Sequence, residues 1–367
     1  GARQAGKTTF LKEQTKSLNS SYVSFDDPDV ISLFEKDIKQ FESQFIEGHD
    51  VTVLDEVQYC EDAGKKLKYL VDKGRKICLS SSSEILLGKE TLSYLVGRVS
   101  VLKLYPFSLR EFLISKGQKE WTKEILERHI WEHATYGGYP KVVTAEGPEL
   151  KKTILGDLYE TMILKDVART FSIDDFRTLG ELAKYLVLNS GSLLSFDGVS
   201  KDVGISFPTL KKYLDALEKS YFIARVPPFY TNKTKEITKQ PKVYFVDTGL
   251  RNFVAKSFNP EIDGQVFENY VFSELLKLGF SPKYWRKKGK AEVDFVVEKG
   301  SEIIPIEIKL SARQNEIERS LRTFIEEYEP KKAMVVSYKA SKNSVKLNGC
   351  EVFFTDVPGM AELLLHS

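Results

Sequence analysis

Short apolar runs alternate with amphipathic stretches along the first third of the chain. Four runs rich in β-branched or aromatic residues predict strands at 22–25, 51–54, 77–80 and 99–104. The stretches between them have helical periodicity. Strands that alternate with helices are typical of a parallel, doubly wound sheet, which binds its ligand at the carboxyl edge. Residues 1–113 are therefore predicted to be an α/β domain.

After residue 113 the pattern becomes mainly helical, and residues 114–170 are interpreted as a small helical lid. Residues 171–250 follow with three helices and a pair of strands, which is the order of a winged helix. These elements are predicted at 176–188, at 196–203, from 207 onward, at 221–226 and at 242–246.

The last part of the chain, residues 251–367, is again a mixture of helices and strands. It begins with an amphipathic helix at 267–276 that leads to a β-hairpin. The predicted hairpin strands and later elements lie at 292–297, 303–309, 316–327, 333–337, 352–354 and 360–365. This order predicts a second α/β domain.

Composition limits the class of protein. The 367 residues include 54 Lys plus Arg against 52 Asp plus Glu, so a nucleic-acid surface would have to be a local patch. Three isolated cysteines favour a reduced, cytoplasmic protein over a zinc site or a disulfide framework. No apolar run reaches the roughly 18 residues of a membrane helix.

The first eight residues, GARQAGKT, fit the P-loop pattern GxxxxGK[ST], although no strand precedes them in the chain. Lys7 is expected to reach the β- and γ-phosphates of ATP and Thr8 to ligate Mg²⁺. An ordinary glycine-rich turn before a helix is the alternative. The predicted nucleotide-binding residues are Gly1, Ala2, Arg3, Gln4, Ala5, Gly6, Lys7, Thr8 and Thr9.

The strand at 51–54 ends in two adjacent carboxylates, which is a Walker B pattern. Asp55 is expected to hold Mg²⁺ and Glu56 to orient the attacking water. Ser80, at the end of the next strand, is a candidate sensor, and Arg98 is a candidate arginine finger. The alternatives are an acidic loop for the carboxylates, a serine-rich turn for Ser80 and a surface ion pair for Arg98.

His129 and His133 have the i, i+4 spacing of metal ligands on a helix, but no third ligand accompanies them. We interpret them as packed or solvated side chains. The sequence GGYP at 137–140 predicts a tight turn between helices.

The third predicted helix of the winged helix carries Thr209, Lys211 and Lys212, and its hairpin is rich in lysine. Such a surface suits DNA phosphates, while packing or protein contact is the alternative. The hairpin lysines are Lys233, Lys235, Lys239 and Lys242.

The hairpin of the last domain brings acids together. With a turn at 299–302, Asp294 lies opposite Glu307, and Lys309 shares a face with Glu307. This D…ExK arrangement is typical of restriction-type nucleases: Asp294 and Glu307 would bind Mg²⁺, Glu268 would complete the metal site, and Lys309 would stabilise or deprotonate water. The basic, aromatic segment 285–290 suits a phosphate backbone, and an inactive scaffold is the alternative.

Taken in order, these motifs resemble the prokaryotic AAA+-like ATPases of the archaeal-ATPase group that carry a C-terminal restriction-nuclease-like domain of uncharacterised function. The resemblance implies ATPase roles for Lys7, Thr8, Asp55 and Glu56, and it matches the nuclease signature at Glu268, Asp294, Glu307 and Lys309. It rests on residues 1–8, 54–58, 80–83, 97–98, 105–112, 137–140, 242–250, 267–269 and 285–309.

Together these observations predict a protein that binds and hydrolyses ATP with Mg²⁺ and associates with DNA or another nucleic acid, with nuclease activity left open. The alternative is a nucleotide-switched nucleic-acid or protein binding module with a catalytically inactive nuclease fold. A homo-oligomer, in which a neighbour supplies Arg98, is compatible with both. The predicted domains are the P-loop ATPase core 1–113, the helical lid 114–170, the winged helix 171–250 and the restriction-nuclease-like domain 251–367.

Overall fold

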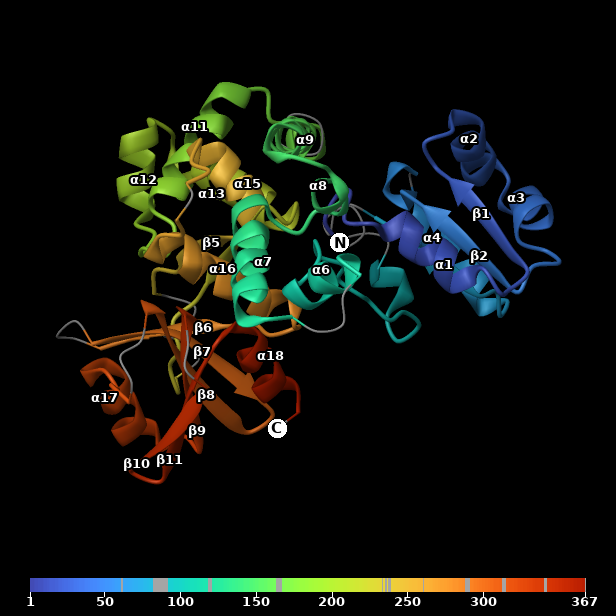
Figure 1. The fold of residues 1–367 in the computed structure, drawn as a ribbon. Coiled ribbons are helices and arrows are strands. Elements are labelled where there is room, and N and C mark those ends of the chain that lie inside the picture. Colours follow the sequence, from blue (N-terminus) through green and yellow to red (C-terminus); the bar gives the residue numbers. More distant parts are fainter. Residues whose placement is uncertain are drawn as a thin grey trace. The chain divides into compact units, whose positions relative to one another are not determined.

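The computed structural model describes the chain except residues 61, 82–91, 118–120, 163–166, 233, 235, 237–238, 260, 288–290, 312–314, 340–341 and 367. It divides into two compact units (Figure 1). The N-terminal unit comprises Gly1–Tyr105, Arg169–Ser172 and Lys219–Tyr221, and the C-terminal unit comprises Pro106–Ala168, Ile173–Glu218 and Phe222–Ser367. The predicted boundary after residue 250 falls inside the C-terminal unit, and the boundary after residue 170 falls within the Arg169–Ser172 segment of the N-terminal unit. The boundary after residue 113 lies near the division at residue 105.

The N-terminal unit is built on a three-stranded parallel sheet in the order β1-β2-β3. All five residues of the central strand β2 are buried, and Phe25, Phe34 and Phe41 pack edge to face beside it. The strands follow in sequence order, so the reversal that defines a doubly wound sheet does not occur among the described strands. The elements are α1 (Lys7–Thr15), β1 (Ser20–Ser24), α2 (Pro28–Lys36), α3 (Ile38–Phe45), β2 (Val51–Asp55), η1 (Val57–Tyr59), α4 (Ala63–Asp72), β3 (Ile77–Leu79) and η2 (Leu92–Leu95).

The strand predicted at 99–104 is wrong, because the structure assigns no regular element to these described residues. Val101 and Leu102 are 63% and 81% exposed, so the apolar run is not covered by a neighbouring strand. Instead, Ala2 N donates to Leu104 O at 2.9 Å, and the Gly1 amino group lies 3.4 Å from Ser81 O. The P-loop backbone thus stands between the end of β3 and residue 104, where a strand would need a ladder partner.

Helices dominate the first part of the C-terminal unit, as the sequence predicts. They are α6 (Leu109–Ser115), α7 (Lys123–Tyr136), α8 (Pro140–Thr144), α9 (Pro148–Glu160), α11 (Phe176–Leu188), α12 (Phe196–Val203), α13 (Phe207–Lys219), α15 (Thr248–Ala255) and α16 (Gly264–Lys277). The short helix α10 (Ala168–Phe171) lies mostly in the Arg169–Ser172 segment of the N-terminal unit. The bounds of α11 and α12 are those predicted from periodicity. After α13, β4 (Ile223–Val226) and β5 (Lys242–Phe245) form an antiparallel pair.

A six-stranded mixed sheet occupies the end of the chain, in the order β10-β11-β9-β8-β7-β6. Phe295 of β7 pairs with Ile306 of β8, and this register, continued by one residue, sets Asp294 opposite Glu307 as predicted. Aromatic residues of α16 pack against the sheet, and α17 contributes to a second cluster with Trp285. The remaining elements are β6 (Lys283–Arg286), β7 (Glu292–Lys299), β8 (Glu302–Ser311), α17 (Arg319–Tyr328), β9 (Lys332–Lys339), β10 (Asn343–Leu347), β11 (Cys350–Thr355) and α18 (Val357–Leu365).

Candidate functional site

The first candidate site is the P-loop at the start of the N-terminal unit. Helix α1 begins at Lys7, directly after Gly6, whose φ of 94° lies in the left-handed region that glycine adopts easily. The Lys7 ammonium donates to Ala2 O at 2.8 Å and to Gly1 O at 3.2 Å. The loop therefore turns into the N-terminus of a helix, where free N–H groups and the helix dipole favour phosphate.

The two nucleotide-site motifs meet at Asp55, the last residue of β2. Thr8 Oγ1 donates to Asp55 Oδ2 at 2.9 Å, and the hydroxyls of Ser80 and Tyr22 also donate to this carboxylate. Asp55 is 6% exposed. Burial opposes ionisation, but the hydrogen bonds from Ser80, Tyr22 and Thr8 lower the pKa of Asp55 below its ordinary value. A buried carboxylate is thus kept charged beside a hydroxyl of the P-loop.

Tyr22 is a site residue that the sequence patterns did not reveal. It lies on β1, where it pairs with Val53, two residues before Asp55 on the same face of the sheet. Burial and the Asp55 carboxylate raise the pKa of its phenol, so Tyr22 remains a hydrogen-bond donor. Only the order of β1 and β2 in the sheet indicates this role, because no local motif surrounds Tyr22.

Glu56 follows Asp55 at the carboxyl edge of the sheet. Its φ of 56° is left-handed, which costs a non-glycine residue about 1 kcal/mol. Backbone strain of this kind concentrates at functional sites.

Arg98 lies in a surface ion pair. Its Nε is 2.9 Å from Asp72 Oδ1, and its side chain is 44% exposed. In the described part of the chain, its hydrogen bonds go to Asp72 and to Val96 O, so the structure does not bring Arg98 to the P-loop.

The second candidate site lies on β7 and β8 of the C-terminal unit. Asp294 Oδ2 accepts a hydrogen bond from Ile308 N at 2.8 Å. Glu307 Oε1 is 3.0 Å from Lys309 Nζ, which also lies 2.8 Å from Glu318 Oε1. Glu307 is 4% exposed, and its Oε2 atom has no hydrogen-bond partner among the described residues.

The electrostatics of this pair reflect crowded negative charge. Burial, reinforced by the carboxylates of Glu307 and Glu268, raises the pKa of Asp294 well above its ordinary value. Burial also raises the pKa of Glu307 to about 7, although the Lys309 ammonium opposes the shift. Around Asp294 and Glu307, negative charge therefore outweighs the positive charge that would keep both carboxyl groups ionised.

Glu268 of α16 does not join the pair as a third ligand. Its Oε1 accepts from Tyr244 OH at 2.5 Å and lies 3.7 Å from Lys242 Nζ. Lys242 also pairs with Glu292 Oε1 at 2.5 Å. Among the residues that the structure describes, no group of three or more His, Cys, Asp or Glu side chains is placed to hold a metal ion. The predicted set of three carboxylates is therefore not assembled, although Asp294 and Glu307 are brought together.

Lys242 corrects the prediction of phosphate contacts by the hairpin lysines. Its side chain is buried against Glu268 and Glu292, because β5 faces the acidic residues of the last domain and not solvent. Lys239 is exposed, and Lys233 and Lys235 lie outside the described residues. On α13, Lys211 and Lys212 are exposed, and Thr209 is half-buried.

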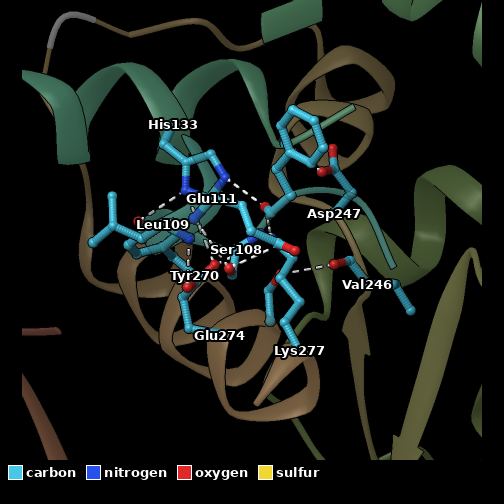
Figure 2. Close-up of polar contacts among 12 residues, drawn as sticks. Ser108, Leu109, Glu111, His133, Val246, Asp247, Tyr270, Glu274 and Lys277 are labelled. Carbon is cyan, nitrogen blue, oxygen red and sulfur yellow. Dashed lines mark hydrogen bonds and ion pairs between the residues drawn. The ribbon is translucent and has the colours of Figure 1, made fainter. Parts of the chain in front are cut away.

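Several sequence motifs meet in a buried polar network instead of a catalytic site (Figure 2). His133 Nδ1 lies 3.0 Å from Tyr270 OH, and its Nε2 lies 2.9 Å from Phe107 O. Burial, with the nearby Lys277 ammonium, lowers the pKa of His133 well below its ordinary value, so the ring is neutral. His129 is half-buried and packs edge-on against Phe112. Of the two alternatives left open by the sequence, packed or solvated, the structure shows packed side chains at both positions.

The same network joins four stretches of chain. Gly138 N donates to Asp247 Oδ2 at 2.8 Å, and Leu109 N donates to Glu274 Oε2 at 2.8 Å. Lys277 Nζ reaches Glu274 Oε1 at 3.1 Å. The bond from Gly138 N satisfies a buried backbone group of the predicted turn at 137–140, which lies between α7 and α8.

Comparison with known proteins gives three family matches. Residues 1–113 match the model described as AAA domain, residues 127–261 match a domain of unknown function (DUF8612), and residues 263–354 match another (DUF4143). The N-terminal region is thus an AAA-type, P-loop ATPase-like domain. No helix in the described part of the chain has both the length and the apolar character to cross a membrane.

The similar curated proteins are uncharacterized. One from Haemophilus influenzae is 28% identical over 335 residues, which cover 86% of this chain and 82% of the relative. One from Methanocaldococcus jannaschii is 28% identical over 316 residues, with coverages of 81% and 70%. The crystal structure of a Vibrio cholerae protein aligns over 95% of this chain and 96% of that chain, with 13% identity and a TM-score of 0.21, too low to define a shared fold.

Proposed function

We propose that this protein binds and hydrolyses ATP in its N-terminal unit and acts on nucleic acid through its C-terminal unit. The observation that carries the first part is the convergence of Thr8 and Ser80 on the Asp55 carboxylate. A hydroxyl and an ionised carboxylate are the hard oxygen ligands that Mg²⁺ prefers. The match of residues 1–113 to an AAA domain supports the same conclusion.

Each residue of the nucleotide site has a separate task in this proposal. Lys7 and the backbone of the loop bind the phosphates, while Glu56 orients the attacking water. Thr8 and Asp55 would hold Mg²⁺, which, when bound, offsets negative charge on the phosphate oxygens. Ser80 and Tyr22 hold Asp55 in its ionised form.

ATP hydrolysis by the purified full chain tests this part. Lys7→Ala and Asp55→Asn should each lower turnover by at least about a hundredfold, because one removes a phosphate contact and the other the metal ligand. Asp72→Asn is the matched control, since Asp72 is a half-exposed carboxylate paired with Arg98. Hydrolysis that persists in Lys7→Ala would contradict the proposal.

For the C-terminal unit we extend the proposal to hydrolysis of a phosphodiester. Asp294, Glu307 and Lys309 gather at neighbouring positions of β7 and β8. The fit to a divalent ion is supported by the buried, unpartnered Glu307 Oε2, because one or two carboxylates commonly hold Mg²⁺ beside substrate phosphates. When bound, the ion would offset charge on the scissile phosphate. Lys309, which Glu307 and Glu318 hold as an ammonium, would orient the attacking water and stabilise the hydroxide that forms from it.

The winged-helix interpretation of 171–250 belongs to the same proposal. It is supported by the order α11, α12, α13, β4, β5 and by the exposed Lys211 and Lys212 on α13. A helix with exposed lysines presents ammonium groups to a phosphate backbone. Lys211→Ala with Lys212→Ala should therefore weaken DNA binding and reduce its salt dependence.

A second candidate function is a nucleotide-switched binding module whose nuclease fold does not cut. The observation that favours it is the engagement of Glu268 by Lys242 and Tyr244, which leaves two carboxylates at the candidate metal site. Cleavage that Glu307→Ala abolishes supports the nuclease. Metal-independent DNA binding without cleavage supports the module.

A further inference from the structure

Lys242 is a buried cation in an acidic cluster: Glu268, Glu292 and Asp294 interact with it, and Glu307 joins the cluster through Asp294. It is 3% exposed, and its ammonium lies 2.5 Å from Glu292 Oε1 and 3.7 Å from Glu268 Oε1. A buried ammonium is retained only where carboxylates compensate its lost hydration. The two carboxylates nearest to it therefore depend on Lys242, and Lys242 depends on them.

Strand β5 supplies two groups that act on Glu268. Tyr244 lies two residues after Lys242, on the same face of the strand, and its hydroxyl donates to Glu268 Oε1 at 2.5 Å. The backbone of Gly191 also packs so closely that an added Cβ would lie 3.0 Å from the same oxygen. Glu268 is thus held from several directions by residues that precede the last domain in the sequence.

The two carboxylates of the proposed metal site, Asp294 and Glu307, lie beside this arrangement but are less fully compensated by hydrogen-bond donors. Glu307 Oε1 pairs with Lys309 Nζ at 3.0 Å, but Glu307 Oε2 is buried without a hydrogen-bond partner among the described residues. Glu268 Oε1, in contrast, has both a hydroxyl and an ammonium nearby. A divalent ion at Asp294 and Glu307 would be attracted by the same group of carboxylates as the Lys242 ammonium. The two cations would therefore repel each other.

We propose that Lys242 is a positioning residue that competes with a divalent cation for the acidic cluster. Its ammonium acts as the internal counter-ion of Glu268 and Glu292. This pairing keeps Glu268 from acting as a ligand of the metal. Removal of Lys242 frees Glu268 to act as a third ligand and removes a neighbouring positive charge. This inference rests on the proposed metal site at Asp294 and Glu307 but not on whether that site cuts a substrate.

The test measures binding of Mn²⁺ alone to the full chain by calorimetry. Lys242→Met should raise Mn²⁺ affinity at least about tenfold, because a buried positive charge is lost and a carboxylate is gained. Lys239→Met is the matched control: this exposed lysine lies three residues earlier, and its loss should leave the affinity unchanged.

Thermal melting gives a second readout. Without metal, Lys242→Met should melt below the wild type, because Glu268 and Glu292 lose their buried partner. Saturating Mn²⁺ should then raise the melting temperature of Lys242→Met more than that of the wild type.

Glu292→Gln keeps the inference testable if Lys242→Met does not fold. It leaves the ammonium in place but removes its nearest carboxylate, so Lys242 should bind the remaining acids more closely and Mn²⁺ affinity should fall. Unchanged affinity in the folded variants of both residues would overturn the inference. If Asp294→Asn leaves wild-type Mn²⁺ binding intact, the proposed metal site itself is wrong.

Discussion

The neutral, buried His133 predicts a specific loss of stability at acid pH. In the unfolded chain a histidine titrates near about 6.5, whereas burial keeps the folded ring neutral well below that pH. Below about pH 6.5 the unfolded state therefore binds a proton that the folded state does not, and stability falls as the pH falls. Between pH 7.5 and 5.5 this single group accounts for about 1.4 kcal/mol of unfolding free energy.

Neighbouring carboxyl groups act in the opposite direction and must be separated from this effect. Burial raises the pKa of Glu274, although Lys277 opposes the shift, so its protonation favours the folded state as the pH falls. The carboxylate of Glu274 lies 3.9 Å from His133 Nδ1. Because Glu274 is present in both proteins, the difference between the wild type and a His133 variant isolates the histidine.

Urea denaturation followed by circular dichroism at pH 7.5, 6.5 and 5.5 measures that difference. His133→Gln should be less stable than the wild type at pH 7.5 by about 1–3 kcal/mol, since the hydrogen bonds to Tyr270 and Phe107 are disturbed. Its further loss on acidification should be smaller than that of the wild type by about 1.4 kcal/mol. His49→Gln, at an exposed position, should keep the wild-type dependence. Identical pH dependence in wild type and His133→Gln would refute the reasoning.

Two further predictions follow from the geometry of single residues. Tyr22→Phe removes a hydroxyl that donates to the Asp55 carboxylate and should weaken Mg²⁺-dependent ATP binding about tenfold in equilibrium titration; unchanged affinity would show that Asp55 needs no support from β1. Gly137→Ala should destabilise the protein more than Gly147→Ala in thermal melting. The two glycines have similar φ angles, 78° and 77°, so the backbone strain of an alanine is the same at both positions. Only at Gly137 would the new Cβ overlap a neighbour, at 2.1 Å from Asp247 Oδ1. Equal losses of stability would contradict the packing described at this turn.

Local periodicity and turn chemistry were sufficient to predict much of the fold. The helices α11 and α12 and the register of β7 with β8 depend on residues close in sequence, so their patterns locate them well. The strand expected at 99–104 failed because a strand forms only against a neighbour, which composition alone does not supply. The apolar residues at 99–104 lie in an exposed segment instead of a strand.

The candidate sites were predictable where a motif is contiguous and not where it depends on tertiary contacts. Lys7, Thr8, Asp55 and Glu56 belong to two short motifs, and the structure brings Thr8 to Asp55. The sequence groups Lys242 with Lys233, Lys235 and Lys239 as a hairpin lysine that contacts phosphate. Its burial against Glu268 and Glu292 arises from segments that are distant in the chain, and no local pattern encodes that contact.

The central claim joins ATP hydrolysis in one unit to nucleic-acid cleavage in the other. The most direct test is cleavage of supercoiled plasmid by the full chain in Mg²⁺ or Mn²⁺, with and without ATP, for the wild type, Glu307→Ala and Lys7→Ala. The account predicts cleavage by the wild type that Glu307→Ala abolishes, with an ATP dependence that Lys7→Ala removes. Absence of cleavage by a wild-type protein that still hydrolyses ATP would contradict it.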